Sequence, residues 1–130
     1  MGFAPFRNQK YLNLETFKKS GEGVKTPVWF AADPGADIAS AAARIFVYTI
    51  GVSGKVKRIR NNGRVKIAPC TMRGDVTGDW QNASAQIITG EEAVRGMDLI
   101  TRKYAPWTHI MNFFARFRRR ERVVMLITPA

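Results

Sequence analysis

Two short stretches of this chain are predicted to be β-strands with apolar side chains on both faces. Within Lys25–Asp33 the run Pro27–Ala31 (PVWFA) is apolar at odd and even positions alike, and Ile45–Ile50 (IFVYTI) is β-branched or aromatic throughout. Because successive side chains of a strand point to opposite faces, neither face of these strands expects water. Such a strand lies between helices, in a barrel whose outside is covered, or at a subunit or ligand interface.

The other elements are read from hydrophobic periodicity and from Gly/Pro punctuation. Gly21 and Gly23 supply the turn of a first hairpin, and the Ala-rich segment Asp33–Arg44 is expected to be a loop with at most a short helical turn. Six strands are expected, at Tyr11–Phe17, Lys25–Asp33, Ile45–Ile50, Gly63–Met72, Asp79–Thr89 and Arg122–Pro129. Helices are expected between Ser53 and Gly63, from Gly90 to about Tyr104, and at Trp107–Arg120, with Pro106 interrupting the last two.

Length and composition limit how these elements assemble. The chain has 130 residues, of which 45% are hydrophobic and 24% charged, which is typical of one globular domain with a single core. Residues 1–130 are therefore expected to form one domain. With six short strands and helices late in the chain, the simplest fold is a small antiparallel β-barrel that dimerises.

The charged residues limit the kinds of ligand the protein could bind, and the cysteine count limits the disulfides and metal sites it could form. Twenty-one Lys and Arg against ten Asp and Glu give a net charge of +11, which favours polyanions, phosphorylated ligands or anionic membrane surfaces. One cysteine, Cys70, and one histidine, His109, exclude an internal disulfide and a Cys/His zinc site. Since no apolar run is long enough for a signal peptide or a spanning helix, a cytoplasmic protein is expected.

The basic stretch Ser53–Gly63 (SGKVKRIRNNG) has the pattern of a short amphipathic helix. Ser53 is a good N-cap, Gly63 is a good C-terminal stop, and Val56 and Ile59 form an apolar stripe that would face the core. The element is therefore predicted to pack one face against the barrel and to leave its cations on the others.

The cations of this helix divide into two sets. At helical spacing Lys55 and Arg58 share one face beside the helix N-terminus, while Lys57 and Arg60 share another. With Ser53 and the free backbone N–H groups, the first pair would make a compact phosphate site. The alternative is an ordinary solvated helix whose basic residues serve solubility.

A series of motifs, in this order, resembles the flavin/deazaflavin oxidoreductases, the split β-barrel relatives of pyridoxamine 5′-phosphate oxidase, and in particular their deazaflavin-dependent class. The motifs are TPVWF (Thr26–Phe30), a strand ending at Thr49, SGKVKRIRNN (Ser53–Asn62), RVKIAPC (Arg64–Cys70) and RGDVTGDW (Arg73–Trp80). The resemblance covers roughly Tyr11–Tyr104. It implies a mainly β fold, a six-stranded antiparallel split β-barrel of the FMN-binding type with a few short helices.

The resemblance also implies a cofactor site and a partner. In this family the cofactor, FMN or the deazaflavin coenzyme F-420, lies in a groove at the interface of a homodimer. It implies a phosphate site at Thr49, Ser53, Lys55 and Arg58. It implies a ring site along Thr26, Pro27, Val28 and Trp29, bordered by Pro69 and Cys70. The chain departs from the family in its longer loop Pro34–Arg44, in the residues TIGV before Ser53, and at Gly63, where proline is frequent.

The implied reaction is hydride transfer by the cofactor to or from a small organic substrate. Such a reaction needs binding, orientation and exclusion of water, and the sequence offers no catalytic triad or carboxylate pair. The deazaflavin coenzyme carries a phosphodiester and an oligoglutamate tail, so an extensive basic surface such as Lys57, Arg60 and Arg116–Arg122 favours it over FMN.

Two other functions fit the same residues. One is a split barrel that binds or carries a flavin without turnover. The other is a nucleic-acid-binding barrel that uses KVKRIR and RFRRR on phosphates and stacks bases on Phe113, Phe114 and Phe117. Those three aromatic residues recur with Ile110 at helical spacing, which favours a core stripe, so no specific nucleic-acid partner is expected.

Overall fold

The computed structural model describes residues 2–50, 54–105 and 122–130. Its strands are β1 (Tyr11–Phe17), β2 (Gly23–Val28), β3 (Phe30–Ala32), β4 (Ile45–Ile50), β5 (Arg64–Cys70), β6 (Gln81–Ile88) and β7 (Arg122–Pro129). Its helices are the 3₁₀ helix η1 (Ala4–Phe6), α1 (Gly54–Asn61) and α2 (Gly90–Lys103). The expected cap Ser53 and the expected helix Trp107–Arg120 lie outside the described residues. Within those ranges no helix combines the length and apolarity needed to cross a membrane.

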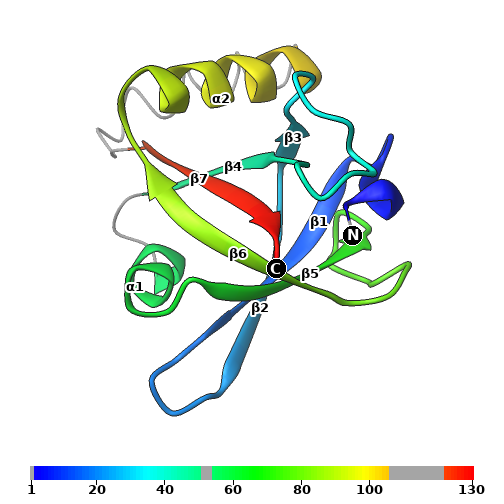
Figure 1. The fold of residues 1–130 in the computed structure, drawn as a ribbon. Coiled ribbons are helices and arrows are strands. Elements are labelled where there is room, and N and C mark those ends of the chain that lie inside the picture. The colour runs from blue at the N-terminus through cyan, green and yellow to red at the C-terminus, as the bar shows by residue number, and fades with distance from the viewer. Residues whose placement is uncertain (1, 51–53, 106–121) are drawn as a thin grey trace.

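The seven strands form one antiparallel sheet in the order β2-β1-β5-β6-β7-β4-β3. Its edge strands β2 and β3 are consecutive in the chain and are separated by Trp29 alone. The sheet therefore has to curl until its two edges approach each other, as Figure 1 shows. The fold is mainly β, a curled antiparallel sheet with two short α-helices, as the sequence predicts.

The prediction of one continuous strand over Lys25–Asp33 is wrong. Val28 makes the last pair with β1, opposite Leu12, and Phe30 makes a pair with β4, opposite Val47. The chain thus changes hydrogen-bonding partner at Trp29, which is why seven strands replace the expected six. The alternation of side chains continues across this corner, so the residue pattern alone shows no break.

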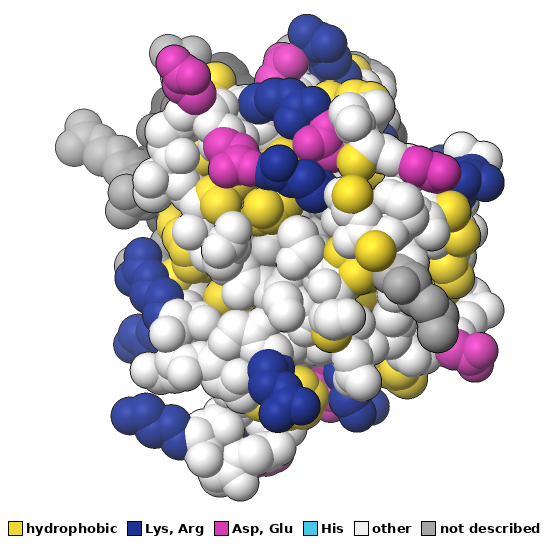
Figure 2. Space-filling model, viewed as in Figure 1, with side chains coloured by type: hydrophobic (Ala, Val, Ile, Leu, Met, Phe, Trp, Pro, Cys, Tyr) yellow, Lys and Arg dark blue, Asp and Glu magenta, His cyan; other side chains and the backbone are white. Residues whose placement is uncertain are grey.

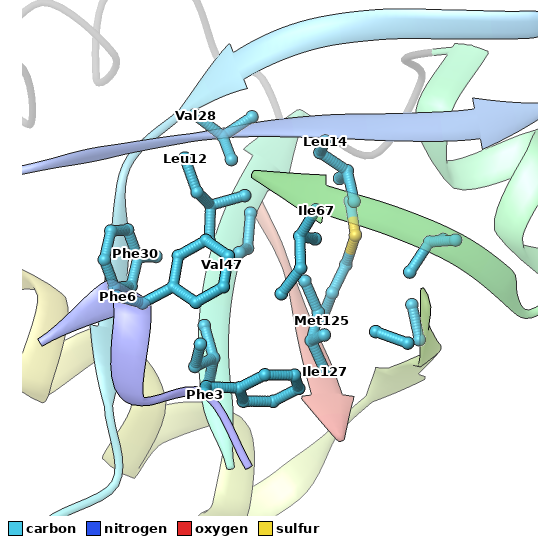
Figure 3. Packing of buried hydrophobic residues seen from close by; sticks show 14 of the residues in the cluster. Phe3, Phe6, Leu12, Leu14, Val28, Phe30, Val47, Ile67, Met125 and Ile127 are labelled. Atoms are coloured by element: carbon cyan, nitrogen blue, oxygen red, sulfur yellow. The ribbon is translucent and has the colours of Figure 1, made fainter. Parts of the chain in front are cut away.

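The inside of the curled sheet holds the main apolar cluster, called here the inner core. Figure 3 shows side chains from both ends of the chain pointing toward one another there. Its buried members are Phe3, Phe6, Leu12, Leu14, Val28, Phe30, Ala43, Ile45, Val47, Ile59, Val65, Ile67, Ala83, Ala85, Met125 and Ile127. Phe3 and Phe6, which flank and belong to η1, were not foreseen as core residues, because two aromatics in so short a segment show no periodicity.

Helix α2 packs on the outside of the sheet, across β4, β3 and β7 (Figure 1). The cluster beneath it, called here the outer layer, consists of Ala31, Phe46, Ile88, Ile100, Tyr104, Val124 and Leu126, with Trp29, Tyr48, Ala93, Met97 and Leu99 packed against it. Strands β3 and β4 are therefore apolar on both faces because they separate the inner core from the outer layer. Of the three arrangements open at the outset, this is the barrel whose outside is covered.

Charged side chains attach the Ala-rich loop to α2. Arg95 of α2 donates two hydrogen bonds to the buried carboxylate of Asp33, at 2.8 and 2.5 Å. Arg44 lies 3.8 Å from the same carboxylate and also forms an ion pair with Glu92. The hydrogen bonds from Arg95, with a backbone hydrogen bond from Gly35 and the nearby guanidinium charges, outweigh burial and lower the pKa of Asp33.

Candidate functional site

A cavity of about 330 Å³ opens where the corner at Trp29 meets the end of β4 and the start of α1. Its lining residues are Tyr11, Pro27, Val28, Trp29, Tyr48, Thr49, Lys55 and Met72. Segments far apart in sequence, from β1 to the loop after β5, therefore contribute to one site. Five of the expected cofactor residues, Pro27, Val28, Trp29, Thr49 and Lys55, lie together here.

The other expected residues are placed differently. Thr26 pairs with Leu14 of β1 and lies outside the cavity lining. Pro69 and Cys70 are buried at the end of β5, also outside the lining. Ser53 lies outside the described residues, so its predicted role as a cap stays a prediction.

Lys55 is the cation among the lining residues that the structure describes. It is partly buried in the first turn of α1, and Val56 and Ile59 of the same helix are buried, as the predicted apolar stripe requires. Burial lowers the pKa of Lys55, and the positive charge of Arg58 lowers it further. An anion placed beside Lys55 would offset both effects, so this end of the cavity favours a negatively charged group.

Arg58 is not part of the lining, although it lies on the same helical face as Lys55. Its Nε donates a hydrogen bond of 2.6 Å to Oγ1 of Thr16, a fully buried hydroxyl on β1. This contact ties α1 to the sheet. In this structure Arg58 thus positions the helix, and its positive charge acts on Lys55 by lowering the pKa of that side chain.

Aromatic side chains form one wall of the cavity. Trp29 stacks on Tyr104 with ring centres 4.4 Å apart and planes within 6°, and its edge approaches Tyr48 at 6.3 Å. The hydroxyl of Tyr104 accepts a hydrogen bond from the Phe30 N–H at 3.0 Å and donates one to the Lys10 carbonyl at 2.5 Å. Tyr104 therefore supports Trp29 at the corner of the sheet through the stacked ring and through hydrogen bonds to the backbone.

The opposite rim is built by the loop that follows β5. Met72 is 69% exposed at the mouth of the cavity. The loop behind it is held by Asn13, whose Nδ2 donates to the Gly74 carbonyl at 2.9 Å, and Gly74 itself has a φ of +93°. A glycine suits this left-handed turn. The exposed thioether thus sits on a loop anchored to β1.

Three lining residues were not foreseen. Tyr11 opens β1, Tyr48 precedes Thr49 on the outer face of β4, and Met72 follows the expected border at Cys70. Tyr48 and Met72 adjoin expected site residues in the sequence. Tyr11 carried no such signal, because only the pairing of β1 with β2 brings it beside Pro27 and Val28.

The described residues do not add a nucleophile or a metal centre to this cavity. No group of three His, Cys, Asp or Glu side chains with metal-binding geometry occurs within 2–50, 54–105 and 122–130. The single thiol, Cys70, is buried as expected, and burial, with the charge of Asp75, raises its pKa. The lining thus offers one cation, aromatic surface and hydroxyl groups, which suits a planar anionic ligand.

Comparison with known proteins gives fold relatives at low sequence identity. No family model matches the chain, and no curated protein matches it. A putative pyridoxamine 5′-phosphate oxidase from Listeria innocua is similar in structure, with a TM-score of 0.63, 14% identity, and coverage of 97% of this chain and 88% of that one.

Two further solved structures show the same likeness. HutZ, the heme storage protein from Vibrio cholerae, has a TM-score of 0.69 at 12% identity, covering 100% of this chain and 92% of that one. A pyridoxamine 5′-phosphate oxidase-related, FMN-binding protein from Nostoc punctiforme has a TM-score of 0.54 at 14% identity, covering 92% and 70% of the two chains. The chain therefore has the fold of the pyridoxamine 5′-phosphate oxidase-like split barrels.

Proposed function

We propose that the cavity binds a flavin-type cofactor, either FMN or the deazaflavin coenzyme, and that the protein is an oxidoreductase acting on a small organic substrate. The observation that supports this most is the lining itself. A partly buried lysine lies at one end of the cavity, and a stacked aromatic wall, Trp29 on Tyr104, lies at another. The fold, shared with a protein described as FMN-binding, agrees with this proposal.

The residues present fit such a group in charge and in surface. Lys55 is partly desolvated and has a lowered pKa, and a phosphate at this place would restore a counter-charge. Trp29, Tyr48 and Tyr11 offer apolar and aromatic surface for a planar ring. The lining residues therefore suit a ligand with one phosphate and one planar ring system.

A bound cofactor would supply hydride transfer. The chain's own part would be binding, orientation and exclusion of water. Lys55 would hold the anionic end, the buried Thr49 would border it, and Trp29, held by Tyr104, would fix the plane against which a ring could lie. Met72, on the exposed rim, would meet the incoming substrate.

We also propose that the protein is a homodimer. Met72 is exposed at the mouth of the cavity, and a second chain could cover that mouth. Obligate dimers often bury more than about 2,000 Å² in total, so dilution should not separate the chains easily. Sedimentation equilibrium at micromolar concentration tests this, and a folded monomer there would exclude the dimer.

The direct test of the cofactor proposal is a spectroscopic titration of the purified protein, separately with FMN and with the deazaflavin coenzyme. Lys55→Ala should weaken binding by roughly 10- to 100-fold, because a charge-assisted hydrogen bond contributes roughly 1.5–3 kcal/mol. The matched control is Lys57→Ala, an exposed cation on the same helix, which should cost no more than about threefold, largely screened by salt.

The same titration separates the alternatives. Equal, salt-sensitive losses for Lys55→Ala and Lys57→Ala would mean a diffuse positive field and no phosphate site. Since HutZ is described as a heme storage protein, heme serves as a third ligand: saturable heme binding without flavin binding would overturn the proposal. Flavin binding without turnover of any reductant or substrate would leave the carrier function in place of the oxidoreductase.

A further inference from the structure

A second cavity, of about 420 Å³, lies on the outer side of the sheet, away from the first. It is bordered by the end of β1 and its hairpin, by the end of α1, and by the neighbouring strands β5 and β6, which lie at the lower centre of Figure 1. None of its described lining residues is shared with the first cavity. Its polar side chains are those of Asn62, Arg64, Lys66, Asn82 and Ser84, and the rest of the described lining consists of Phe17, Gly21, Val65, Ala83 and Ala130.

The register of β5 and β6 arranges the polar residues as two pairs. Arg64 stands opposite Ser84, and Lys66 stands opposite Asn82, and all four are exposed on the same outer face. Because Arg64 and Lys66 are two residues apart on one strand, their Cα atoms are separated by about 6.6 Å. The groove therefore presents two cations, each with a neutral hydrogen-bonding neighbour.

These groups are available as donors. The side-chain oxygen of Asn62 already accepts the Arg64 backbone N–H at 3.1 Å, which leaves its amide NH₂ to donate. Within the part of the chain that the structure describes, the ion pairs involve other residues than Arg64 and Lys66. Glu15 of β1 is opposite Lys66 in the register but is not part of the lining, whereas Ala130, the last residue of the sequence, is.

Basic side chains also gather over the neighbouring helix α1. In Figure 2 the acidic side chains lie mainly over α2, beside Lys and Arg, whereas Lys and Arg alone are seen over α1. The exposed Lys57 and Arg60 of α1 add to the positive field. A positive field of this kind attracts anions in general. Selectivity for a particular anion would have to come from the paired arrangement of side chains within the groove.

We propose that this groove is a binding site for a small organic dianion with two separated carboxylates. Arg64 with Ser84 takes one carboxylate, and Lys66 with Asn82 takes the other, while the carbon chain between them lies beside Phe17. Two cations at separate strand positions match two single charges better than the concentrated charge of one phosphate. The site is independent of the proposed cofactor cavity.

The test is a titration of the full chain with adipate, followed by the backbone amide signals in two-dimensional NMR. Saturable shifts are expected at the amides of residues 62–66 and 82–84, and not at residues 28–29 or 48–49. Arg64→Ala and Lys66→Ala should each weaken adipate binding by roughly 10- to 100-fold. Both side chains are exposed, so both variants should keep the wild-type circular dichroism spectrum.

Matched controls make the outcome decisive. Lys57→Ala, a cation outside the groove, should change adipate affinity by less than about threefold, and added salt should remove that change. Propionate and inorganic phosphate should bind at least about tenfold more weakly than adipate, because each can meet only one of the two cations. Absence of saturation, equal affinity for propionate or phosphate, or an equal loss in Lys57→Ala would each overturn the proposal.

The two cavities are tested separately. Arg64→Ala should leave FMN and deazaflavin binding unchanged, and Lys55→Ala should leave adipate binding unchanged. If flavin titration shows no binding while adipate still saturates the groove, the proposed function fails and this inference stands. A loss of adipate binding in Lys55→Ala would show that adipate occupies the first cavity, which would overturn the inference.

Discussion

The inner core and the outer layer are both apolar, but they stand in different relations to the candidate site. The inner core joins side chains from every strand and meets the cavity lining at Val28. The outer layer joins α2 to β3, β4 and β7, and the lining residues Trp29 and Tyr48 pack directly against it. A fold of this kind can therefore be stabilised from one side and have its site adjusted from the other.

The first prediction concerns the inner core. Leu14→Ala, at a fully buried position, should destabilise the protein by about 2–5 kcal/mol, because it removes buried methyl groups and leaves a cavity. Under conditions where the variant is folded, its affinity for FMN should stay within about twofold of wild type, since Leu14 lies in the inner core and outside the cavity lining. Urea denaturation and flavin titration measure the two quantities.

Ile100→Ala is the matched change in the outer layer. Ile100 is also fully buried, so a similar loss of about 2–5 kcal/mol is expected, together with weaker flavin binding, because α2 supports the Trp29 wall. If Leu14→Ala lowered the affinity and Ile100→Ala did not, the division between the two clusters would be wrong. Ile67→Val, expected to cost about 0.5–1.5 kcal/mol, is the milder inner-core variant if Leu14→Ala does not fold.

The same comparison shows what the residue pattern could predict. Strand alternation predicted both apolar faces of β4, and the structure shows that Ile45 and Val47 belong to the inner core and Phe46 to the outer layer. It could not predict the corner at Trp29, because alternation continues through a change of partner strand. The alternation of residues along a strand predicts which face of the sheet each side chain lies on. Which other residues that face contacts depends on how distant strands pair.

For the site too, the sequence predicted what depends on neighbouring residues and not what depends on contacts between distant segments. Residues next to one another in the expected motifs, such as Pro27–Trp29, do line the cavity. Arg58 shares a helical face with Lys55 but lies outside the cavity lining. Its Nε donates a hydrogen bond to the buried hydroxyl of Thr16, which is distant in the sequence. Tyr11 enters the lining through the pairing of β1 and β2, which no local signal indicates.

The second prediction sharpens the comparison at Tyr104, which belongs to the outer layer and touches the site. Tyr104→Phe removes the hydroxyl that accepts from the Phe30 N–H and donates to the Lys10 carbonyl. Because these groups are buried or partly buried, leaving them without a partner should cost about 1–3 kcal/mol. The ring still stacks on Trp29, so flavin affinity should change little.

Tyr104→Leu is the companion variant, since it removes the hydroxyl and the stacked ring together. It should lose stability as Tyr104→Phe does and should also weaken flavin binding, because Trp29 loses the ring that fixes its plane. Equal flavin affinities for Tyr104→Phe and Tyr104→Leu would show that the stack does not position Trp29. Chemical denaturation and flavin titration of both variants provide the measurements.

The third prediction concerns the close approach of α2 to the sheet. A Cβ on Gly96 would lie 2.7 Å from Cδ1 of Phe46 and 3.2 Å from Cγ1 of Val124, so this helical position has no room for a side chain. Gly96→Leu should therefore destabilise the protein by about 1–3 kcal/mol through overpacking, although leucine is the better helix former. Val94→Leu, at a position that is 70% exposed on the same helix, should be nearly neutral. A stabilised Gly96→Leu variant would mean that α2 is free to move away from β4.

The fourth and smallest effect depends on pH and tests how the outer layer is fastened to the loop before β4. The pKa of Asp33 is lowered, chiefly by the hydrogen bonds from Arg95, so its folded-state value lies below the value of about 3.9 expected in an unfolded chain. A carboxyl group with a depressed pKa stabilises the fold fully above its unfolded pKa, and this contribution is lost as pH falls through the folded value.

Asp33→Asn should accordingly be less stable than wild type at pH 7, and the difference should shrink as the pH falls below about 4, where the carboxyl group becomes protonated in the unfolded chain while it stays ionised in the folded protein down to a lower pH. Urea denaturation of both proteins from pH 7 to pH 3 measures it. Asp98→Asn removes an exposed carboxylate that pairs with Arg102 on the same helix, and it should change stability little at any pH. A constant difference between Asp33→Asn and wild type across this range would show that the carboxylate acts through its shape and hydrogen bonds alone, and that its charge contributes nothing to holding α2 against the loop.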